Sequence, residues 1–347
     1  MIVLGISPGH NSSIGLYING KIVSMVCEER FSKIKNHVGF PHYGLKYVLK
    51  ENNLSPKDID LAVIVGDSPR SQMINLTSNG KTMERFLDKK HSFKDSLRKI
   101  IPKTWIKKYS YFKWSFKEEY IFNKYSEILG MPKSKIKFID GHTAHALSAA
   151  PNIKKDTLIL TLDGEDGRYC ATVSVFDGNK IKYISRIPSD NSIGLLYTFI
   201  TEYLGMKPNE HEFKIMGLAP YAKGERIYEV KKIFDDIISF KEKGLNFESK
   251  KDMHYISKYL TEKLKGYRFD YIAAAIQLKA EELALEFVKR AIEYTNLRKI
   301  ALSGGVFMNV KINQLIGELR KVNELFIVPS SGDESSPIGC IFWGIKK

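Results

Sequence analysis

One local pattern occurs in both halves of this sequence: an apolar strand, a polar turn that contains glycine, and a second strand. The first copy runs over Ile2–Ile18 with its turn at Ser7–Ser13, and the second runs over Leu158–Phe176 with its turn at Asp163–Gly167. Backbone amides and small polar side chains on such turns are suited to face phosphate groups. The duplication constrains the chain to fold into two lobes of related structure.

The elements that follow the first copy predict the class of fold. An Asn-Gly hairpin turn leads into a returning strand at Lys21–Cys27, a helix at Tyr43–Glu51 and a parallel strand at Leu61–Val65. Together with the second hairpin, this order predicts a two-lobed α/β fold of the actin-like ATPase and sugar-kinase type. We expect the first lobe over residues 1–150 and the second over 151–347. A plain β-meander explains the first hairpin alone equally well.

Residues 71–125 differ in composition from the rest of the first lobe. Lys and Arg outnumber Asp and Glu there, and aromatic residues recur at helical spacing, namely Trp105, Tyr109, Phe112, Phe116 and Tyr120. An amphipathic helix packed on the first lobe explains this spacing. A helical insertion that caps the cleft and contacts a substrate is the alternative. Basic residues interleaved with aromatic residues would also suit binding of single-stranded nucleic acid, but we do not expect nucleic acid as a partner.

The composition limits the compartments and partners to consider. The 347 residues are 43% hydrophobic and 27% charged, as in a globular chain long enough for two lobes. No apolar run approaches the ~20 residues of a membrane span, the start lacks signal-peptide features, and the three cysteines share no disulfide or metal spacing. We therefore expect a cytoplasmic protein. The net charge of +15 could attract nucleic acid, an anionic membrane or a phosphorylated ligand. Because the lysines are spread over the whole chain, an ordinary solvated surface explains the charge as well.

Two histidines stand three residues apart in Phe138–Ala149, where a strand leads into a helix. This spacing places the imidazoles of His142 and His145 on one helical face. Neutral imidazole is a common ligand of zinc and iron, so the pair is a candidate metal site. A helix cap or a packed polar pair is the commoner explanation of such histidines.

Three polar segments have features of a nucleotide site. The first turn contributes a small hydroxyl, and the second contributes carboxylates that can hold a metal ion against phosphate oxygens. The third segment, Ser303–Asn309, follows a short strand, and its glycines allow the backbone and helix amides to approach a nucleotide closely. The candidate nucleotide-binding residues are Ser12, Gly164, Asp166, Gly304, Gly305, Asn309 and Asn313.

Charged clusters beside predicted elements supply candidates for catalysis. Glu28–His37 follows the returning strand, and its Lys35 could face an anionic ligand. Asn209–Tyr221, which contains Lys214, runs from charged into apolar residues and is typical of a cleft wall or of a surface turn. Both lysines are candidates for charge stabilisation. His10, at the tip of the first turn, is the candidate general base or substrate contact.

Taken in order, these motifs resemble the O-carbamoyltransferase family of antibiotic and nodulation-factor tailoring enzymes. The matching stretches extend over almost the whole chain: Gly5–Leu16, Glu28–Pro41, Phe138–Ala149, Leu160–Gly167, Ser192–Tyr221, Ser303–Asn313 and Pro329–Gly339. The resemblance implies that carbamoyl phosphate and ATP give carbamoyl-adenylate, from which the carbamoyl group passes to a hydroxyl or amine of a small molecule or sugar. The chain also looks similar to the tRNA-modifying threonylcarbamoyl transferase, a metal-containing actin-like protein.

The resemblance further implies a site for a divalent metal, either iron or zinc, or magnesium with the nucleotide. His145, Asp163 and Asp333 match three ligand positions of the family. The fourth position is Gly141 here, and His142 could replace it only if the helix start shifts. We therefore expect weak metal binding, because one ligand is missing.

The family normally carries a further C-terminal domain that forms the carbamoyl-adenylate, and this sequence ends at Lys347 without it. The resemblance therefore predicts a transfer module that needs a separate adenylate-forming protein. Two other functions stay open. One is a tRNA-modifying enzyme, favoured by the net charge, and the other is a non-catalytic nucleotide-binding scaffold, favoured by Gly141.

Overall fold

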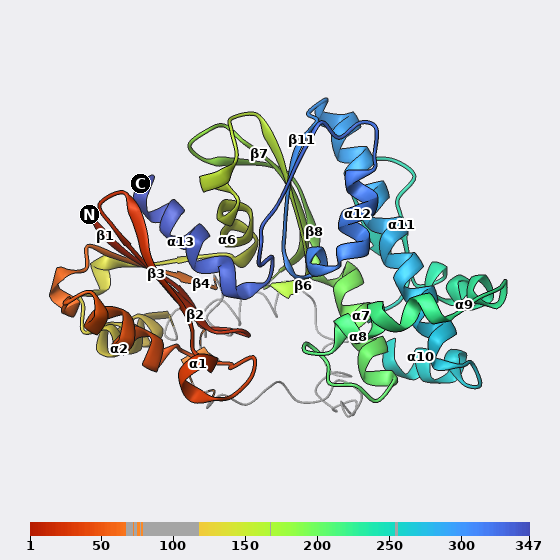
Figure 1. Ribbon diagram of the computed structural model, residues 1–347, viewed down its shortest axis with the longest axis horizontal. Coiled ribbons are helices and arrows are strands. Elements are labelled where there is room, and N and C mark those ends of the chain that lie inside the picture. The colour runs from red at the N-terminus through yellow and green to blue at the C-terminus, as the bar shows by residue number, and fades with distance from the viewer. Residues whose placement is uncertain (67–71, 73–74, 77, 79–117, 167, 254–255) are drawn as a thin grey trace, which may run out of the picture.

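Two five-stranded sheets with equivalent strand orders form the framework of the protein (Figure 1). The computed structural model describes residues 1–66, 72, 75, 76, 78, 118–166, 168–253 and 256–347. The first sheet has the order β3-β2-β1-β4-β5 and the second the order β8-β7-β6-β11-β12. In each sheet an antiparallel meander of three strands continues, beside its first strand, into two parallel strands. The repeated order confirms the predicted two-lobed actin-like α/β fold.

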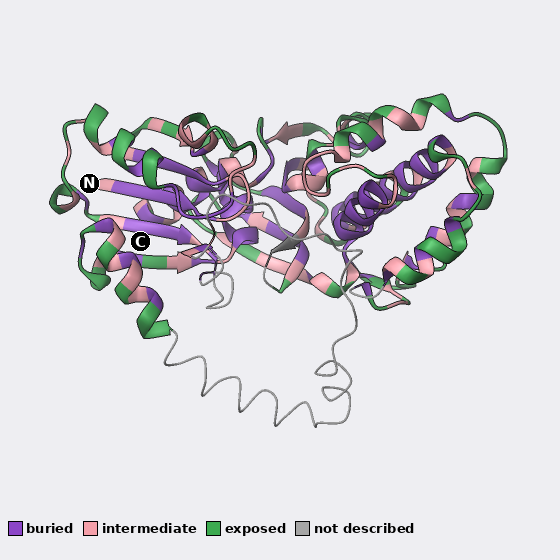
Figure 2. Ribbon diagram, turned by 90° about the horizontal axis from the view of Figure 1, so that it is seen from below, coloured by how far each residue is buried: buried purple, intermediate pink, exposed green. Residues whose placement is uncertain are grey.

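The first sheet has a separate apolar core on each face. Its strands are β1 (Ile2–Ser7), β2 (Ser13–Ile18), β3 (Lys21–Cys27), β4 (Leu61–Val65) and β5 (Ile136–Ile139). Because side chains alternate along a strand, Leu4 and Ile6 of β1 join the core beneath α2 (His42–Glu51), whereas Val3 joins the core on the opposite face. Figure 2 shows the strands beside the N-terminus as largely buried.

The second sheet lies between a large helical layer and a smaller one. Its strands are β6 (Thr157–Asp166), β7 (Tyr169–Phe176), β8 (Ile181–Pro188), β11 (Lys299–Ser303) and β12 (Glu324–Ile327). The large layer contains α7 (Ile193–Tyr203), α8 (Glu212–Leu218), α9 (Arg226–Asp235), α10 (Ile256–Leu264), α11 (Phe269–Thr295), α12 (Val310–Gly317) and the short strands β9 (Ile238–Phe240) and β10 (Phe247–Ser249). Most residues of the long helix α11 are buried (Figure 2).

Two helices lie between the sheets, and each packs on the sheet of the other half of the chain (Figure 1). Helix α6 (Gly141–Ser148) follows β5, yet its Leu147 packs against the core beside β6 and β11. Helix α13 (Ser336–Ile345) follows the second sheet, yet its Ile341 packs against Val3 and Val63 of the first. The N-terminal ends of α6 and α13 therefore meet between the lobes.

The helical insertion predicted for residues 71–125 lies mainly outside the described residues. The helical residues 118–129 bury Ile121 and Tyr125 in the core of the first sheet, whereas Tyr120 is 48% exposed. The predicted aromatic stripe therefore does not include Tyr120. Within the part of the chain that the structure describes, no helix has both the length and the hydropathy required to cross a membrane.

Candidate functional site

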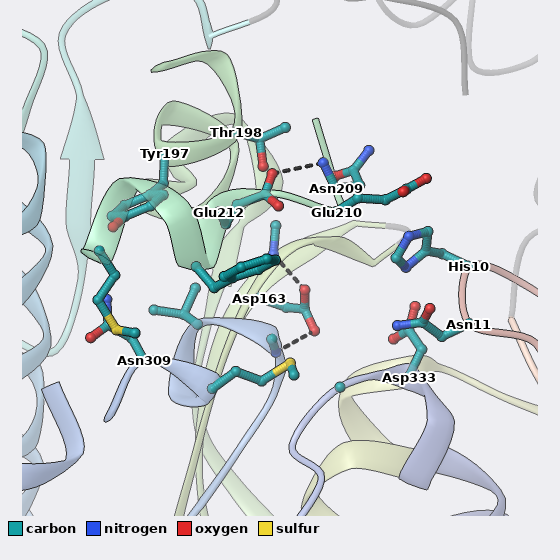
Figure 3. Close-up of a pocket in the computed structure, with 18 of the residues that line it drawn as sticks. His10, Asn11, Asp163, Tyr197, Thr198, Asn209, Glu210, Glu212, Asn309 and Asp333 are labelled. Carbon is teal, nitrogen blue, oxygen red and sulfur yellow. Dashed lines mark hydrogen bonds between the residues drawn. The ribbon is translucent and has the colours of Figure 1, made fainter. Parts of the chain in front are cut away.

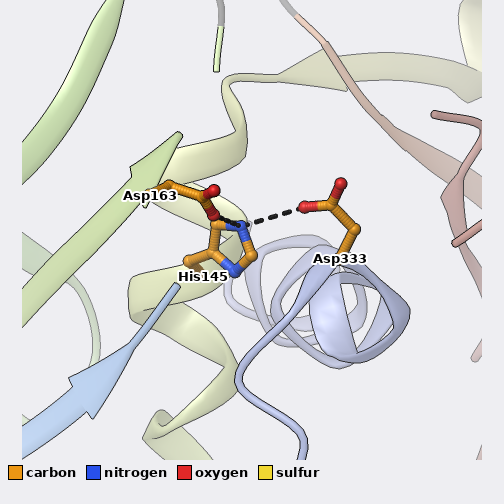
Figure 4. A group of neighbouring side chains, drawn as sticks. All are labelled: His145, Asp163 and Asp333. Carbon is orange, nitrogen blue, oxygen red and sulfur yellow. Dashed lines mark ion pairs between the residues drawn. The ribbon is translucent and has the colours of Figure 1, made fainter. Parts of the chain in front are cut away.

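Three candidate metal ligands from separate segments meet between the lobes (Figure 4). His145 lies on α6, Asp163 lies on β6, and Asp333 begins the short helical turn Asp333–Ser335 before α13. The Nε2 atom of His145 is 3.0 Å from the Oδ2 atom of Asp163 and 3.2 Å from the Oδ1 atom of Asp333. All three potential ligand atoms lie within 4.8 Å of one another. The structure thus brings together the three residues that the resemblance assigned to the metal.

The electrostatics of this cluster favour a bound positive charge. Both ring nitrogens of His145 are buried and have no hydrogen-bond partner within the part of the chain that the structure describes, although Nε2 is within ion-pair distance of the two carboxylates. Burial alone would lower the pKa of His145, but Asp163 and Asp333 outweigh this effect and raise it well above its usual value. A divalent cation would satisfy the same two carboxylates and the free imidazole nitrogen. His145, Asp163 and Asp333 therefore fit a metal site of three protein ligands.

Asp163 is held in place by the backbone of two glycines. Its Oδ1 atom accepts a hydrogen bond from the Gly164 amide at 2.6 Å, and its Oδ2 atom accepts one from the Gly305 amide at 3.0 Å. Burial alone would raise the pKa of Asp163, but His145 and the Gly305 amide outweigh this effect and lower the pKa below its usual value, so the carboxylate is ionised. The polar turn of the second hairpin and the glycine turn after β11 therefore converge on one carboxylate.

His142, the other histidine of α6, does not join the cluster. Its Nδ1 atom lies 2.7 Å from the Thr161 hydroxyl, and its Nε2 atom lies 3.0 Å from the carbonyl oxygen of Tyr169. With Nε2 donating to the carbonyl, Nδ1 accepts from the hydroxyl, so neither nitrogen is free for a metal. Burial lowers the pKa of His142 and keeps the ring neutral. This residue fits the packed polar role that was the alternative to a ligand role.

A cavity of about 380 Å³ opens beside the cluster (Figure 3). Its polar lining includes Asp163 and Asp333, together with His10 from the first-lobe turn and Glu212 from α8. Figure 3 shows Tyr197 and Asn309 at the side opposite His10, with Asp163 between them. The lining residues anticipated from the sequence are His10, Lys35, Asp163, Gly164, Gly305, Asn309 and Asp333.

Backbone hydrogen bonds between two loops hold the first-lobe wall of the cavity. The Gly39 amide donates to the Pro8 carbonyl oxygen at 3.2 Å, and the Ser12 amide donates to the His37 carbonyl oxygen at 3.0 Å. These bonds join the β1–β2 turn to the loop that carries Lys35. The buried Nε2 atom of His10 has no hydrogen-bond partner among the described residues. This nitrogen therefore has an unsatisfied hydrogen-bonding capacity in the wall of the cavity.

The second-lobe wall combines an apolar recess with a polar network. Its apolar lining consists of Ile193, Phe213, Met216, Ala280, Val306, Met308 and Ile312. The Tyr197 hydroxyl donates to the Gln277 Oε1 atom at 2.9 Å, and the Asn309 Nδ2 atom donates to the same oxygen, also at 2.9 Å. Asn309 also caps α12 by accepting bonds from the Lys311 and Ile312 amides. Such a recess suits a flat, partly polar group such as a nucleobase.

The other candidate residues do not line the cavity. Ser12 is buried, Gly304 has φ +99° and packs against the Leu162 backbone, and the Asn313 Nδ2 atom donates to the Phe307 carbonyl oxygen. Lys214 lies on α8 with its ammonium nitrogen 6.0 Å from the centre of the Phe213 ring. Asp166 ends β6, and its side chain lies outside what the structure describes.

Sequence reasoning did not single out Tyr197 or Glu212, although it described Asn209–Tyr221 as a possible cleft wall. Glu212 accepts a hydrogen bond from the Asn209 amide at 2.7 Å, and burial raises its pKa. The signal for Glu212 was the charged cluster itself, but the sequence does not indicate which of its side chains turns inward. Tyr197 had no signal beyond its place on an apolar helix.

Comparison with known proteins identifies the family. The family model described as "Carbamoyltransferase N-terminus" matches residues 2–342. The chain belongs to the carbamoyltransferase family. It is 32% identical to the uncharacterized protein sll1178 of Synechocystis sp., over 97% of this chain and 56% of that protein. It is 23% identical to the nodulation protein NolNO of Sinorhizobium fredii, over 95% of this chain and 45% of that protein. This carbamoyltransferase-family chain spans about half the length of these curated relatives.

A solved structure supports the fold assignment of this family member. The activator of the 2-hydroxyisocaproyl-CoA dehydratase from Clostridium difficile, with bound ADPNP, superimposes with a TM-score of 0.50 and 13% sequence identity. The superposition covers 99% of this chain and 94% of the activator. At this identity the likeness concerns the actin-like fold alone.

Proposed function

We propose that this chain transfers a carbamoyl group from carbamoyl-adenylate to a hydroxyl or amine of a small molecule or sugar. The observation that carries the proposal is the cavity, which has an apolar recess at one end, His10 at the other and the His145–Asp163–Asp333 cluster beside it. Membership of the carbamoyltransferase family supports the choice of the transferred group.

The recess is the place for the adenosine part of the ligand. Tyr197 and Asn309 lie where a nucleobase would enter, and the backbone at Gly305, which lines the cavity, allows close approach of the ribose and phosphate. The carbamoyl carbon then lies toward His10 and Lys35. The Lys35 ammonium group would neutralise charge on the departing phosphate.

The transfer step needs a nucleophile, a base and a leaving group. The acceptor oxygen or nitrogen attacks the carbamoyl carbon, the bond from that carbon to the phosphate oxygen breaks, and AMP leaves with the bonding electron pair. His10 takes the acceptor proton at its unpartnered ring nitrogen. A divalent ion held by His145, Asp163 and Asp333 would polarise an oxygen of the reacting group.

The carbamoyl-adenylate must be formed from carbamoyl phosphate and ATP before transfer. The cavity beside the cluster is assigned to the transfer step, and we assign the adenylation step to another polypeptide segment. The curated relatives are about twice as long as the matched region, so such a segment could lie on the same protein or on a separate partner.

Isotope-labelled carbamoyl phosphate and ATP, supplied with a carbamoyl-adenylate-forming protein, test the proposal against a panel of hydroxyl and amine acceptors. Label should pass to an acceptor with the wild-type chain and fail to pass with His10→Gln, which keeps hydrogen-bonding capacity but takes up no proton. Calorimetry with a non-hydrolysable sulfamoyl analogue of carbamoyl-adenylate tests binding separately. Binding without transfer to any acceptor would favour the non-catalytic scaffold, and absence of both would refute the assignment of the cavity.

A further inference from the structure

One carboxylate connects the first-lobe turn to the loop that carries a metal ligand. The Glu334 Oε2 atom accepts a hydrogen bond from the Asn11 Nδ2 atom at 3.3 Å, and its Oε1 atom accepts one from the Ser330 hydroxyl. Asn11 follows His10 in the β1–β2 turn, and Glu334 follows Asp333. The contact therefore joins the two segments that bring His10 and Asp333 to the cavity.

The backbone on both sides is shaped around this carboxylate. Asn11 has φ +52°, a left-handed conformation that asparagine adopts more readily than most residues. A Cβ atom at Gly332 would lie 2.6 Å from the Glu334 Oε2 atom, so any side chain at that position would displace the carboxylate. Gly332 thus leaves the space that the Glu334 carboxylate occupies beside Asn11.

The charge of Glu334 also acts on a second first-lobe element. Burial raises the pKa of the Cys27 thiol at the end of β3, and the Glu334 carboxylate raises it further. Glu334 is therefore close to the first sheet at two points, the β1–β2 turn and the end of β3. Cys27 is partly exposed, whereas Cys170 and Cys340 are buried.

We propose that Glu334 is a positioning residue that holds the turn carrying His10 against the loop carrying Asp333. A single hydrogen bond in a partly exposed place contributes little to folding. Its importance lies in geometry, because a displacement of about 1 Å between reacting groups can lower a rate by about 100-fold. The consequence for catalysis rests on the proposed function, whereas the contact between Asn11 and Glu334 does not.

The first test examines the contact between Asn11 and Glu334 without any transfer assay. The pH dependence of Cys27 alkylation gives its pKa in the wild type, in Glu334→Gln and in Asn11→Ala. Glu334→Gln removes the charge and should lower the Cys27 pKa. Asn11→Ala keeps the charge but releases the carboxylate, so the Cys27 pKa should also fall. A wild-type Cys27 pKa in Asn11→Ala would show that Asn11 does not hold Glu334, and would overturn the proposal.

The second test uses the transfer assay. Glu334→Ala and Asn11→Ala should each lower kcat at least about 10-fold with little change in KM for the adenylate, and the double variant should be no worse than either single variant. Glu334→Gln should restore most of kcat, because its amide oxygen can accept the Asn11 bond. Wild-type kcat in Glu334→Ala, additive losses, or a loss that follows the bound metal content would each refute the positioning role.

Glu318→Ala is a matched control for both tests. The Glu318 Oε1 atom accepts a hydrogen bond from the Gln314 Nε2 atom at 2.9 Å, a side-chain contact of the same chemical type that joins neighbouring residues near the end of α12. This variant should keep wild-type kcat and Cys27 reactivity. If the wild type transfers no carbamoyl group, the Cys27 measurements still show whether Asn11 holds Glu334. Failure of the proposed function and failure of this inference are therefore distinguishable.

Discussion

Gly339 on α13 packs directly against the backbone of Ala144 on α6. A Cβ atom at Gly339 would overlap the Ala144 carbonyl oxygen, so the two helices cross with no space for a side chain. His145 follows Ala144, and Asp333 begins the turn that leads into α13. The helix crossing therefore sets the relative position of two candidate metal ligands that come from different halves of the chain.

Gly339→Ala should destabilise the protein by about 1–3 kcal/mol or more, because the added methyl group must separate two packed helices. Since the separation moves His145 away from Asp333, bound metal should fall as well. Chemical unfolding and elemental analysis measure the two effects. Gly317→Ala is the control, because a Cβ atom there would make an ordinary contact with Leu325 at 3.6 Å. Equal stability of the two variants would contradict the crossing argument.

Single substitutions in and beside the cluster should distinguish the roles of the two histidines of α6. Asp163→Asn and Asp333→Asn should each remove most of the bound divalent metal, because a site of three protein ligands loses one of them. His142→Asn should lower the melting temperature but keep the metal, because both nitrogens of His142 bond to Thr161 and Tyr169. Elemental analysis after dialysis measures this. Metal loss in His142→Asn with retention in Asp333→Asn would reverse the ligand assignment.

The two-lobed fold could be predicted because its signals are local. Each hairpin is a short apolar run interrupted by a glycine-containing turn, so each copy can be recognised from neighbouring residues alone. The short helix α9 gave no comparable signal, because it buries only Val230 and Phe234 within a charged stretch. A helix that packs through so few side chains lacks a readable period.

The cluster could be predicted only in part for a different reason. His142 and His145 share one helical face, and the choice between them depends on contacts with β6 and β7, which are distant in the sequence. The same holds for the cavity, where Tyr197 and Glu212 turn inward because α7 and α8 pack on α11. Local spacing restricts the candidates, and the tertiary contacts then select among them.

Asn309 should have separable roles in stability and in nucleotide binding. Asn309→Ala removes the cap of α12, which is expected to cost about 1 kcal/mol, and also removes the bonds to Gln277. Asn309→Ser keeps a capping hydroxyl but cannot reproduce the amide pair. We therefore expect Asn309→Ser to keep most of the stability while losing part of the melting-temperature increase caused by AMP or ATP. A full nucleotide-induced increase in both variants would exclude Asn309 from the recess.

A buried lysine of the second lobe should make stability depend on pH. The Lys279 side chain is 2% exposed, and its Nζ atom lies 2.7 Å from Asp235 and 2.8 Å from Glu282. Burial raises the pKa of Asp235 and of Glu282, but Lys231 and Lys279 outweigh this and lower both pKa values below their usual range. Carboxylates with lowered pKa values stabilise the folded state above their ordinary pKa, and this contribution is lost as the pH falls through the folded-state values.

Lys279→Met should therefore destabilise the protein most at neutral pH, where both carboxylates are charged. We expect a loss of about 2 kcal/mol, less than for a fully buried ion pair, because Asp235 and Glu282 remain partly in solvent. The difference from the wild type should shrink as the pH falls below about 5. Urea unfolding across this range measures it. Lys321→Met, which removes an exposed partner of Glu293, should change stability little at any pH, and a Lys279→Met effect independent of pH would contradict the electrostatic origin.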